Sequence, residues 1–317
     1  MNTAVDLLVV NYNTAHLLPE MFESMNEASG CLVINYLIVD NASRDDSVSI
    51  LKNKYSNALL VENQVNVGFG RANNQLVSFI KGNYALLLNT DAFPEKGALD
   101  KTIDYMESNP DVGVLGVRLI GPDAVLQPCC RYFPTPFNVF LARTGLAKYF
   151  PWVRLVDDMD WDHCSLRECD WVPGCYYLIR REVIEQVGLF DPIFFLYCEE
   201  VDHCKRVKEA GWKVIYFPHA SVVHIGGESA KSAGVLSSEG RQLSVLQIES
   251  EMLYFRKHHG LHGLIWHMLL VSLGDLILLL KDVLKRRGLS AMRSNLRHTV
   301  LSWRLLFQTR LAARPTR

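Results

Sequence analysis

Three carboxylates lie within four residues of one another, at Glu199, Glu200 and Asp202. Like charges at such short spacing repel one another, and this repulsion raises the pKa of neighbouring carboxyl groups. A carboxylate with a raised pKa that follows the apolar residues 194–197 is suited to act as a general base. The same residues also suit the first turn of a helix, where the helix dipole favours negative charge. The spacing alone leaves the catalytic and the structural interpretation open.

Polar residues follow three apolar runs that have the length of buried strands. The runs cover residues 5–10, 31–39 and 84–88, and the polar residues after them are Asn11, Tyr12 and Asn13, then Asp40 and Asn41, then Asn89, Thr90 and Asp91. In open α/β sheets, ligands bind in the crevice outside the carboxyl ends of the strands. One such polar group is an ordinary loop, but three at equivalent strand ends predict a binding site.

These strand-end residues have the chemistry that a sugar nucleotide requires. Asp40 can accept a hydrogen bond from a pyrimidine N–H, and Tyr12 offers a stacking face. Asp91 can bind Mg2+ or Mn2+, which take oxygen ligands and are completed by substrate phosphates. An aspartate after a strand is also a common turn or helix-cap residue. His224, after a later apolar run, is a candidate second metal ligand, although a single histidine is more often structural.

The spacing of apolar residues predicts alternating strands and helices over the first half of the chain. Strands are expected at 5–10, 31–39, 58–61, 84–88 and 113–120, and helices at 16–28, 44–55, 70–81 and 97–108. This alternation favours an α/β fold with a Rossmann-like, mostly parallel sheet flanked by helices. Further strands are expected at 171–180, 212–217 and 220–224, with helices at 181–187 and 201–210. The irregular stretch 122–170 is either an acceptor-side loop region or surface decoration.

The chain carries a net charge of −1, which hides two regions of opposite charge. Residues 281–317 contain ten Lys or Arg and one acidic residue and carry +9, whereas residues 1–280 carry −10. A basic tail after an acidic body suggests an anionic partner, either a membrane or a nucleic acid. No nucleic-acid recognition motif accompanies the tail, so we expect an anionic membrane surface and no nucleic acid.

Three helices are expected in the C-terminal region, at 242–259, at 264–280 and around residues 293–311. The second is strongly apolar, but Asp275 near its middle makes a membrane span costly, so a helix on the membrane surface or packed on another helix fits better. The last carries an apolar stripe edged by arginines, made of Leu296, Val300, Trp303, Phe307 and Leu311 with Arg293, Arg297 and Arg304. That pattern is typical of an interfacial helix, and the alternative is a stripe docked on the protein itself.

Eight cysteines are scattered without a CxxC pair, and residues 1–10 lack a basic segment followed by a long apolar run. We therefore expect a cytoplasmic protein with reduced thiols. Cys164 and Cys169 near His163 have too loose a spacing to favour a zinc site.

The motifs as a set resemble the family 2 glycosyltransferases, and most closely the bacterial rhamnosyltransferases of cell-surface polysaccharide assembly. The first half of the resemblance consists of VVNYN at 9–13, VDNAS at 39–43, NVGFG at 66–70, ANN at 72–74 and LLNTD at 87–91. The second half consists of Gly174, GxFD at 188–191, FF at 194–195, EExD at 199–202, Arg206 and Gly211, with YFRKHHG at 254–260. The resemblance covers roughly residues 5–230.

The resemblance implies a GT-A fold, a divalent metal ion and an inverting displacement. The donor-binding residues expected on this basis are Tyr12, Asn13, Asp40, Asn41, Asn66, Gly68, Arg71, Asn73, Asn89 and Thr90. Asp91 takes the last position of the metal-binding DxD motif, and His224 resembles a late metal-side histidine. Glu200 falls at the position of the catalytic base, with Glu199 as the second choice and Asp202 as a supporting carboxylate.

Two departures from the family pattern affect these assignments. Asn89 stands where the first DxD carboxylate is expected, so the metal has one charged ligand fewer. The base position carries Glu rather than the more usual Asp, and the extra methylene leaves Glu199 and Glu200 both open.

We expect a glycosyltransferase domain at 1–240 and a helical, membrane-associating region at 241–317. The expected activity is transfer of a sugar, with L-rhamnose from dTDP-L-rhamnose favoured, to a lipid-linked or saccharide acceptor at the inner face of the cell membrane. One alternative is a catalytically silent sugar-nucleotide or lipid-binding protein of the same fold. A nucleotidyltransferase is disfavoured, because no glycine-rich, lysine-bearing phosphate loop lies near the N-terminus.

Overall fold

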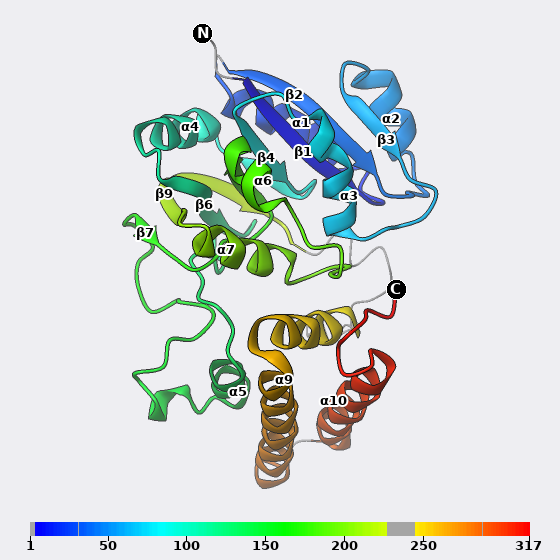
Figure 1. Cartoon of the computed structure of the whole chain (residues 1–317), viewed down its shortest axis with the longest axis vertical. Helices are drawn as coiled ribbons and strands as arrows, with labels where there is room; N and C mark the ends of the chain where they lie inside the picture. The colour runs from blue at the N-terminus through cyan, green and yellow to red at the C-terminus, as the bar shows by residue number, and fades with distance from the viewer. Residues whose placement is uncertain (1–3, 31, 227–244, 287) are drawn as a thin grey trace. The chain divides into compact units, whose positions relative to one another are not determined.

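Figure 1 shows a computed structural model of the chain, which describes residues 4–30, 32–226, 245–286 and 288–317. The chain forms two compact units. The sheet unit comprises Met1–Arg131, Met159–Pro192 and Glu199–Val235, and the helical unit comprises Tyr132–Asp158, Ile193–Cys198 and Leu236–Arg317. The helical unit therefore includes part of the irregular stretch that we could not assign from the sequence. The expected domain boundary at 240–241 lies outside the described residues.

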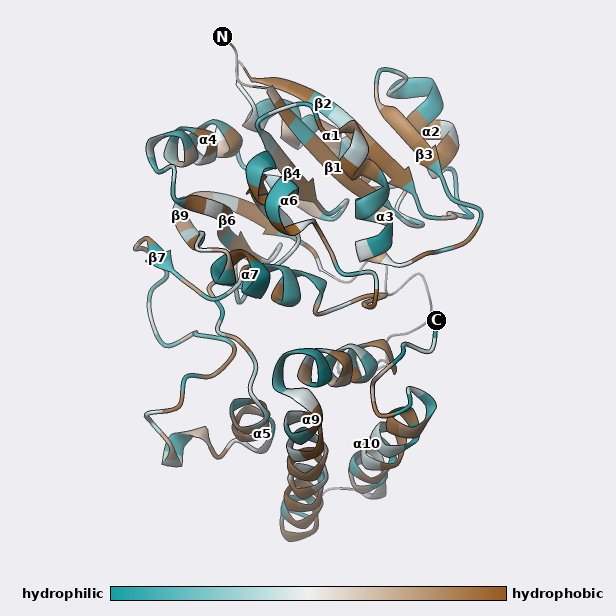
Figure 2. Ribbon diagram, viewed as in Figure 1, coloured by the Kyte–Doolittle hydropathy of each residue, from teal (hydrophilic) through white to brown (hydrophobic). Residues whose placement is uncertain are grey.

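Among the described residues, the sheet unit is built on one sheet of nine strands in the order β3-β2-β1-β4-β8-β6-β9-β5, with β7 also paired to β9. The strands are β1 (Ala4–Asn11), β2 (Val33–Asp40), β3 (Leu59–Glu62), β4 (Tyr84–Leu88), β5 (Ala92–Pro94), β6 (Val112–Ile120), β7 (Arg167–Glu168), β8 (Tyr176–Arg180) and β9 (Lys213–His224). Figure 2 shows the inner strands as largely hydrophobic, as expected for strands covered by helices.

The sheet is mixed in direction. Strands β2 and β3 pair in parallel, β1 pairs in parallel with β2 and β4, and β6 pairs in parallel with β9. Strand β8 runs antiparallel to β4 and β6, and the short strands β5 and β7 run antiparallel to β9. A buried antiparallel strand is as apolar as a parallel one, so the run at 176–180 did not reveal its direction.

The parallel register brings the strand-end polar groups together. Asn11 at the end of β1 pairs with Asp40 at the end of β2, and the adjoining strand β4 ends at Leu88, directly before Asn89. The expected strands at 212–217 and 220–224 are one strand, β9. Its pairing with β6 shifts register after Phe217, where Pro218 offers no N–H to the ladder.

Six α-helices of the sheet unit flank the sheet in the described part of the chain: α1 (Leu18–Ala28), α2 (Ser47–Lys54), α3 (Phe69–Leu76), α4 (Ala98–Ser108), α6 (Arg181–Val187) and α7 (Glu199–Glu209). Helix α1 buries Leu18, Met21, Phe22 and Met25 on one face, which is the spacing of an amphipathic helix. Helix α3 ends earlier than expected, and a 3-10 turn follows at Val77–Phe79.

The chain that follows the 3-10 turn is held by a residue distant in sequence. The buried carboxylate of Asp6 accepts hydrogen bonds from the backbone N–H groups of Lys81 (2.7 Å) and Gly82 (2.6 Å). These bonds hold the chain in an extended turn that leads into β4, and they satisfy a carboxylate that would otherwise be costly to bury.

The helical unit consists mainly of α5 (Pro136–Thr144), α9 (Val245–Leu284) and α10 (Leu289–Gln308). The two helices expected at 242–259 and 264–280 are two segments of α9, which bends at Gly260 (φ 66°, ψ −169°). Glycine tolerates a positive φ at no steric cost, so it permits the sharp change of direction. Helices α5 and α10 both pack against α9.

Candidate active site

A network of buried polar groups forms at the ends of β1 and β2. The side-chain amide of Asn11 donates to Asp40 Oδ1 (2.7 Å) and to Ser43 Oγ (3.0 Å). The backbone N–H of Ser43 donates to Asp40 Oδ2 (3.0 Å). Asn13, which has a φ of 54°, donates its backbone N–H to Ser43 Oγ (2.9 Å). Asp40 is thus fixed at the sheet edge, whereas Tyr12 beside it is partly exposed.

Asn41 organises the next loop. Its amide nitrogen donates to Asn66 Oδ1 (3.0 Å), and its amide oxygen accepts from the side chain of Asn63 (3.1 Å) and the backbone N–H of Val67 (3.0 Å). Asn66 Oδ1 also accepts from the backbone N–H of Gly68 (2.9 Å). The expected donor-binding residues Asn41, Asn66 and Gly68 therefore form one connected group.

Gly68 begins α3 with a φ of 91°, which a residue with a Cβ rarely adopts. The first turn of that helix carries Arg71, whose Nε donates to the carbonyl of Pro192 (2.8 Å). Asn73 is buried and donates to the carbonyl of Phe69 (3.0 Å), and its Oδ1 is a buried acceptor without a partner among the described residues. Free N–H groups at a helix N-terminus favour anions such as phosphate.

The residues after β4 connect to the same network. Thr14 Oγ1 bridges Asn11 Oδ1 (2.8 Å) and Thr90 Oγ1 (2.9 Å). The backbone N–H of Asn89 donates to the carbonyl of Cys175 (3.2 Å), and that residue directly precedes β8. The strand ends of β1, β2 and β4 therefore meet, as expected from the parallel arrangement.

Asp91 and His224 lie beside each other because β5 pairs with β9 in the register Ala92 to His224. Nε2 of His224 is 3.7 Å from Oδ1 of Asp91, and both side chains are largely buried. On the other side of the ring, Nδ1 lies 2.8 Å from Oε1 of Gln127, whose amide nitrogen donates to the carbonyl of His224 (2.8 Å). Gln127 can only accept at that oxygen, so Nδ1 carries the proton and Nε2 faces Asp91 with its lone pair.

This arrangement fits a divalent cation. Burial lowers the pKa of His224, with Asp91 acting in the opposite direction, so the ring tends to be neutral and able to donate a lone pair to a metal. A histidine ligand whose second nitrogen is held by an oxygen acceptor is the usual arrangement in metal sites. No group of three or more His, Cys, Asp or Glu side chains suited to a metal occurs in the described part of the chain.

Glu199 and Glu200 begin α7, and both carboxyl groups have raised pKa values. For Glu199 burial is the main cause and the neighbouring charge of Glu200 adds to it, so its pKa lies well above the usual value. For Glu200 burial also raises the pKa, while a hydrogen bond from the backbone of Gly174 and the positive charge of Arg131 oppose the increase. Glu199 therefore has the higher pKa of the two, so it takes up a proton before Glu200 as the pH falls.

Glu200 also has an acceptor atom to offer. Its Oε2 is buried and has no hydrogen-bond partner among the described residues, and the same holds for Oε2 of Glu199. Asp202, by contrast, is committed to Arg206 (2.9 Å), which also donates to the carbonyls of Val187 and Leu189. Asp202 therefore holds the loop after α6 and is not available as a base.

Residues Gly174 and Cys175 connect the two halves of the site. Gly174 donates to Glu200, and the carbonyl of Cys175 accepts from Asn89. Burial raises the pKa of the Cys175 thiol, and the nearby charges of Asp91 and Glu200 raise it further. The candidate metal ligand and the candidate base therefore both lie near this short segment.

Two side chains in this site were missed by the sequence analysis. Gln127 orients His224, and Arg131 lies near Glu200 with its guanidinium 4.1 Å from the ring centre of Trp171. Both come from the irregular stretch at 122–170, which has no periodic pattern that would have singled them out.

Known proteins with sequences similar to this chain are glycosyltransferases. Residues 6–137 match the family model "Glycosyl transferase family 2". The N-acetylglucosaminyl-diphospho-decaprenol L-rhamnosyltransferase of Mycobacterium tuberculosis is 26% identical over 242 residues, covering 71% of this chain and 76% of that protein. The rhamnosyltransferase WbbL of Escherichia coli is 26% identical over 179 residues, covering 52% of this chain and 63% of that protein.

Among solved structures, the mannosyltransferase PcManGT from Pyrobaculum calidifontis, in complex with GDP-Man and Mn2+, aligns with a TM-score of 0.54 and 17% identity. The alignment covers 99% of this chain and 86% of that one. The fold is the GT-A fold, and the family match and the named relatives support a glycosyltransferase. Residues 6–137 match the family 2 glycosyltransferases, and the chain is similar to bacterial rhamnosyltransferases, so the resemblance noted in the sequence is confirmed.

Proposed function

We propose that this chain catalyses the inverting transfer of L-rhamnose from dTDP-L-rhamnose to a hydroxyl of a lipid-linked saccharide in surface polysaccharide or glycolipid synthesis. Two relatives named as rhamnosyltransferases support the sugar, and one of them is named for a diphospho-decaprenol acceptor. The observation that carries the proposal is the buried, unpartnered Oε2 of Glu200, since a base must offer a lone pair to the acceptor hydroxyl.

In the proposed reaction, Glu200 Oε2 takes the proton of the acceptor hydroxyl as the oxygen attacks the anomeric carbon. The bond from that carbon to the nucleoside diphosphate breaks, and its electron pair leaves with the diphosphate. Attack from the face opposite the leaving group inverts the anomeric configuration. Glu199 remains protonated beside Glu200, so it neither competes as base nor adds a second negative charge to the site.

The donor residues have separate roles in this proposal. Asp40, fixed by Asn11 and Ser43, accepts a hydrogen bond from the pyrimidine, and Tyr12 offers its ring to the base. Asn41, Asn66, Gly68 and the first turn of α3, with Arg71 and Asn73, line the approach of the ribose and phosphates. Asn89 and Thr90 extend this surface toward Asp91.

Asp91 and His224 are the proposed protein ligands of Mg2+ or Mn2+. When bound, such an ion supplies positive charge that stabilises the departing diphosphate. With only one carboxylate in the pair, the site is expected to bind the ion weakly alone and more tightly with the donor diphosphate. The reaction is proposed to take place at the cytoplasmic face of the membrane, where a lipid-linked acceptor is embedded.

A screen of nucleotide sugars tests the donor assignment. The thermal midpoint of the protein is measured with each donor in the presence and absence of Mn2+, because a ligand that binds the folded state stabilises it by mass action. The proposal expects the largest stabilisation from dTDP-L-rhamnose with Mn2+, followed by sugar transfer to a lipid-linked acceptor in the same buffer. A larger shift and faster transfer with another nucleotide sugar would overturn the donor, and donor binding without transfer to any acceptor would favour a silent binding protein.

A further inference from the structure

The segment of α9 after Gly260 has a continuous apolar face turned outward. Exposed side chains recur every three or four residues along it, at Ile265, Leu269, Leu273, Leu276, Leu280 and Leu284. Trp266, 61% exposed, lies next to this line. Since this spacing repeats the helical period, the residues form one stripe along the whole segment. We call this stripe, with Trp266, the α9 face.

Helix α10 adds a second apolar stripe. Leu296, Val300 and Phe307 are exposed, Val300 by 67% and Phe307 by 70%, while Leu305, Leu306 and Ser302 on its other side are buried. Trp303, which the sequence placed in the stripe, is partly buried, and its Nε1 donates to Ser272 Oγ of α9 (2.9 Å). Both helices therefore bury apolar side chains on one side, Leu305 and Leu306 on α10 and Met268 and Val271 on α9, and leave a second apolar stripe exposed.

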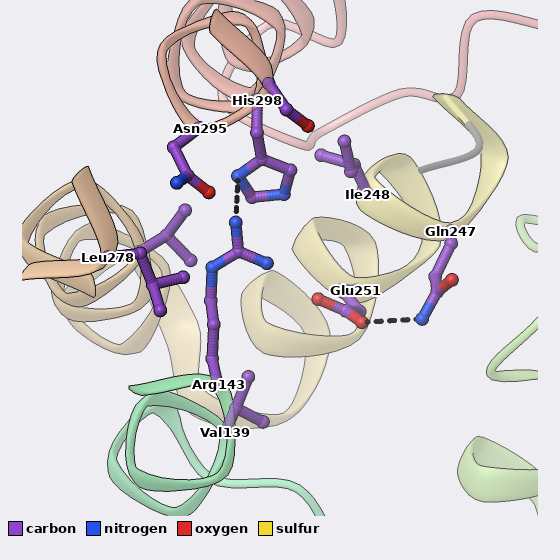
Figure 3. Close-up of a pocket in the computed structure, with 10 residues that line it drawn as sticks. Val139, Arg143, Gln247, Ile248, Glu251, Leu278, Asn295 and His298 are labelled. Atoms are coloured by element: carbon purple, nitrogen blue, oxygen red, sulfur yellow. Dashed lines mark hydrogen bonds between the residues drawn. The ribbon is translucent and has the colours of Figure 1, made fainter. Parts of the chain in front are cut away.

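The polar groups of this unit are turned inward. Asp275 forms an ion pair with Arg143 of α5 and accepts hydrogen bonds from Nδ1 of His298 (2.8 Å) and from Thr299 Oγ1 (2.6 Å). Figure 3 shows Arg143, His298 and Glu251 converging on a cavity of about 490 Å³ between α5, α9 and α10. The carboxylate of Asp275, near the middle of the apolar segment, therefore finds its ion-pair and hydrogen-bond partners within the helical unit.

Positive charge borders the outward stripes. Arg293, Arg297 and Arg304 are exposed on α10, and Lys285 and Arg286 are exposed just after α9. These are the residues of the basic tail noted in the sequence. An uncovered apolar surface edged by cations is complementary to an anionic lipid headgroup layer above an acyl core.

We infer that α9 and α10 insert together into one leaflet of an anionic membrane, with the α9 face lying in the plane of the membrane. By length and composition α9 is the one helix of the described residues that is apolar enough to span a membrane. A span at residues 261–284 would draw Asp275 and its partner Arg143 into the hydrocarbon together with α5. Helix α5 has nine residues and is about 14 Å long, too short to cross a hydrocarbon core of about 30 Å.

Membrane insertion of α9 and α10 rests on the proposed function, because it describes how the enzyme would bind the membrane that holds its lipid-linked acceptor. Its test measures partitioning and depth and not sugar transfer, so the two proposals can fail separately.

The first experiment is co-sedimentation of the full-length protein with vesicles. Vesicles of phosphatidylcholine alone are compared with vesicles containing one third phosphatidylglycerol. We expect binding to the anionic vesicles and at least tenfold less binding by the variant Leu273→Glu/Leu276→Glu, whose altered side chains are both exposed. The control Val65→Glu/Val125→Glu places the same two charges at exposed apolar positions of the sheet unit and should bind as the unaltered chain does.

Equal partitioning of the double variant and the unaltered chain would overturn the inference. The inference would also be overturned if the unaltered chain forms a dimer and binds no vesicles, while the double variant is a monomer. That result would show that the α9 face is a dimer interface. Circular dichroism and the thermal midpoint of each variant establish that it is folded.

The second experiment separates an in-plane helix from a spanning one. Trp266 of the unaltered chain is compared with Leu273→Trp and Leu280→Trp, each in a Trp266→Phe background, using lipids brominated at shallow or deep acyl positions. The quenching of the other five tryptophans is measured in Trp266→Phe alone and subtracted. An in-plane helix predicts equal quenching depth at all three positions. A deepest position at 273, with 266 and 280 nearer opposite surfaces, would show a span and overturn the inference.

Discussion

Nε2 of His224 lies 3.7 Å from Oδ1 of Asp91, although 133 positions of sequence separate the two residues. The antiparallel pairing of β5 with β9 produces this proximity, and Gln127 fixes which ring nitrogen faces the carboxylate. In the proposed metal site, which has a single carboxylate, the orientation of the histidine should contribute much of the affinity for the ion. This relationship leads to the first prediction.

Replacing Gln127 by Leu is expected to weaken Mn2+ binding about tenfold to a hundredfold, because the second partner of a ligating histidine fixes its tautomer and direction. The measurement is a Mn2+ titration of the protein in the presence of a nucleoside diphosphate. Gln127→Glu, which keeps an oxygen acceptor for Nδ1, should lose less affinity. Unchanged binding by Gln127→Leu would remove His224 from the proposed metal site.

The pH dependence of transfer follows from the raised pKa of Glu200. The base must be ionised, so the rate is expected to fall as the pH decreases through a pKa above the usual 4.5 of a glutamate. Arg131 lowers that pKa by its charge, so Arg131→Gln should move the acidic limb of the kcat profile to higher pH. A profile that is flat down to pH 4.5, or an acidic limb that does not move in the variant, would contradict this account.

Glu199 is expected to reduce stability as the pH rises. Its folded-state pKa is raised mainly by burial, so the folded chain retains a proton that the unfolded chain releases above pH 4.5. Stability is therefore lost progressively between pH 4.5 and the raised pKa. Glu199→Gln removes this loss, and its thermal midpoint should exceed that of the unaltered chain by an amount that grows with pH. A difference that is constant from pH 4.5 to 8 would argue against a protonated Glu199.

The ion pair inside the helical unit is expected to matter for stability. Asp275→Asn leaves Arg143 without its charged partner in a largely buried position and should cost about 3 kcal/mol, at the low end for a broken buried pair because Arg143 is 26% exposed. Urea unfolding measures the loss. In a double-mutant cycle, Arg143→Gln in the Asp275→Asn background should cost much less than Arg143→Gln alone. Additive effects would mean that the pair is not coupled.

The meeting of the strand-end polar groups could be predicted from the sequence, for physical reasons. Buried parallel strands are continuous apolar runs, so the polar groups after β1, β2 and β4 were visible as strand ends. The direction of β8 and the merging of two expected strands into β9 depend on long-range pairing and left no local signal.

The remaining details of the site depend on burial. Spacing could not distinguish Glu199 from Glu200, because both lie in the same helical turn and differ only in what surrounds each carboxyl group. Gln127 belongs to an irregular stretch and gains its role only when β5 meets β9. The kink at Gly260 joins two correctly expected helices, but a lone glycine in a helical pattern does not reveal whether the helix bends or ends.

The central claim is that Glu200 is the base of the transfer reaction, and single-turnover kinetics of Glu200→Gln test it most directly. Glutamine keeps the size of the side chain and removes its ability to take a proton, so we expect transfer to slow by about 10²–10⁴-fold while the dissociation constant of the nucleotide sugar stays within about twofold. Glu199→Gln, measured beside it, should retain transfer. Transfer at the unaltered rate by Glu200→Gln, or loss of transfer only in Glu199→Gln, would contradict the account.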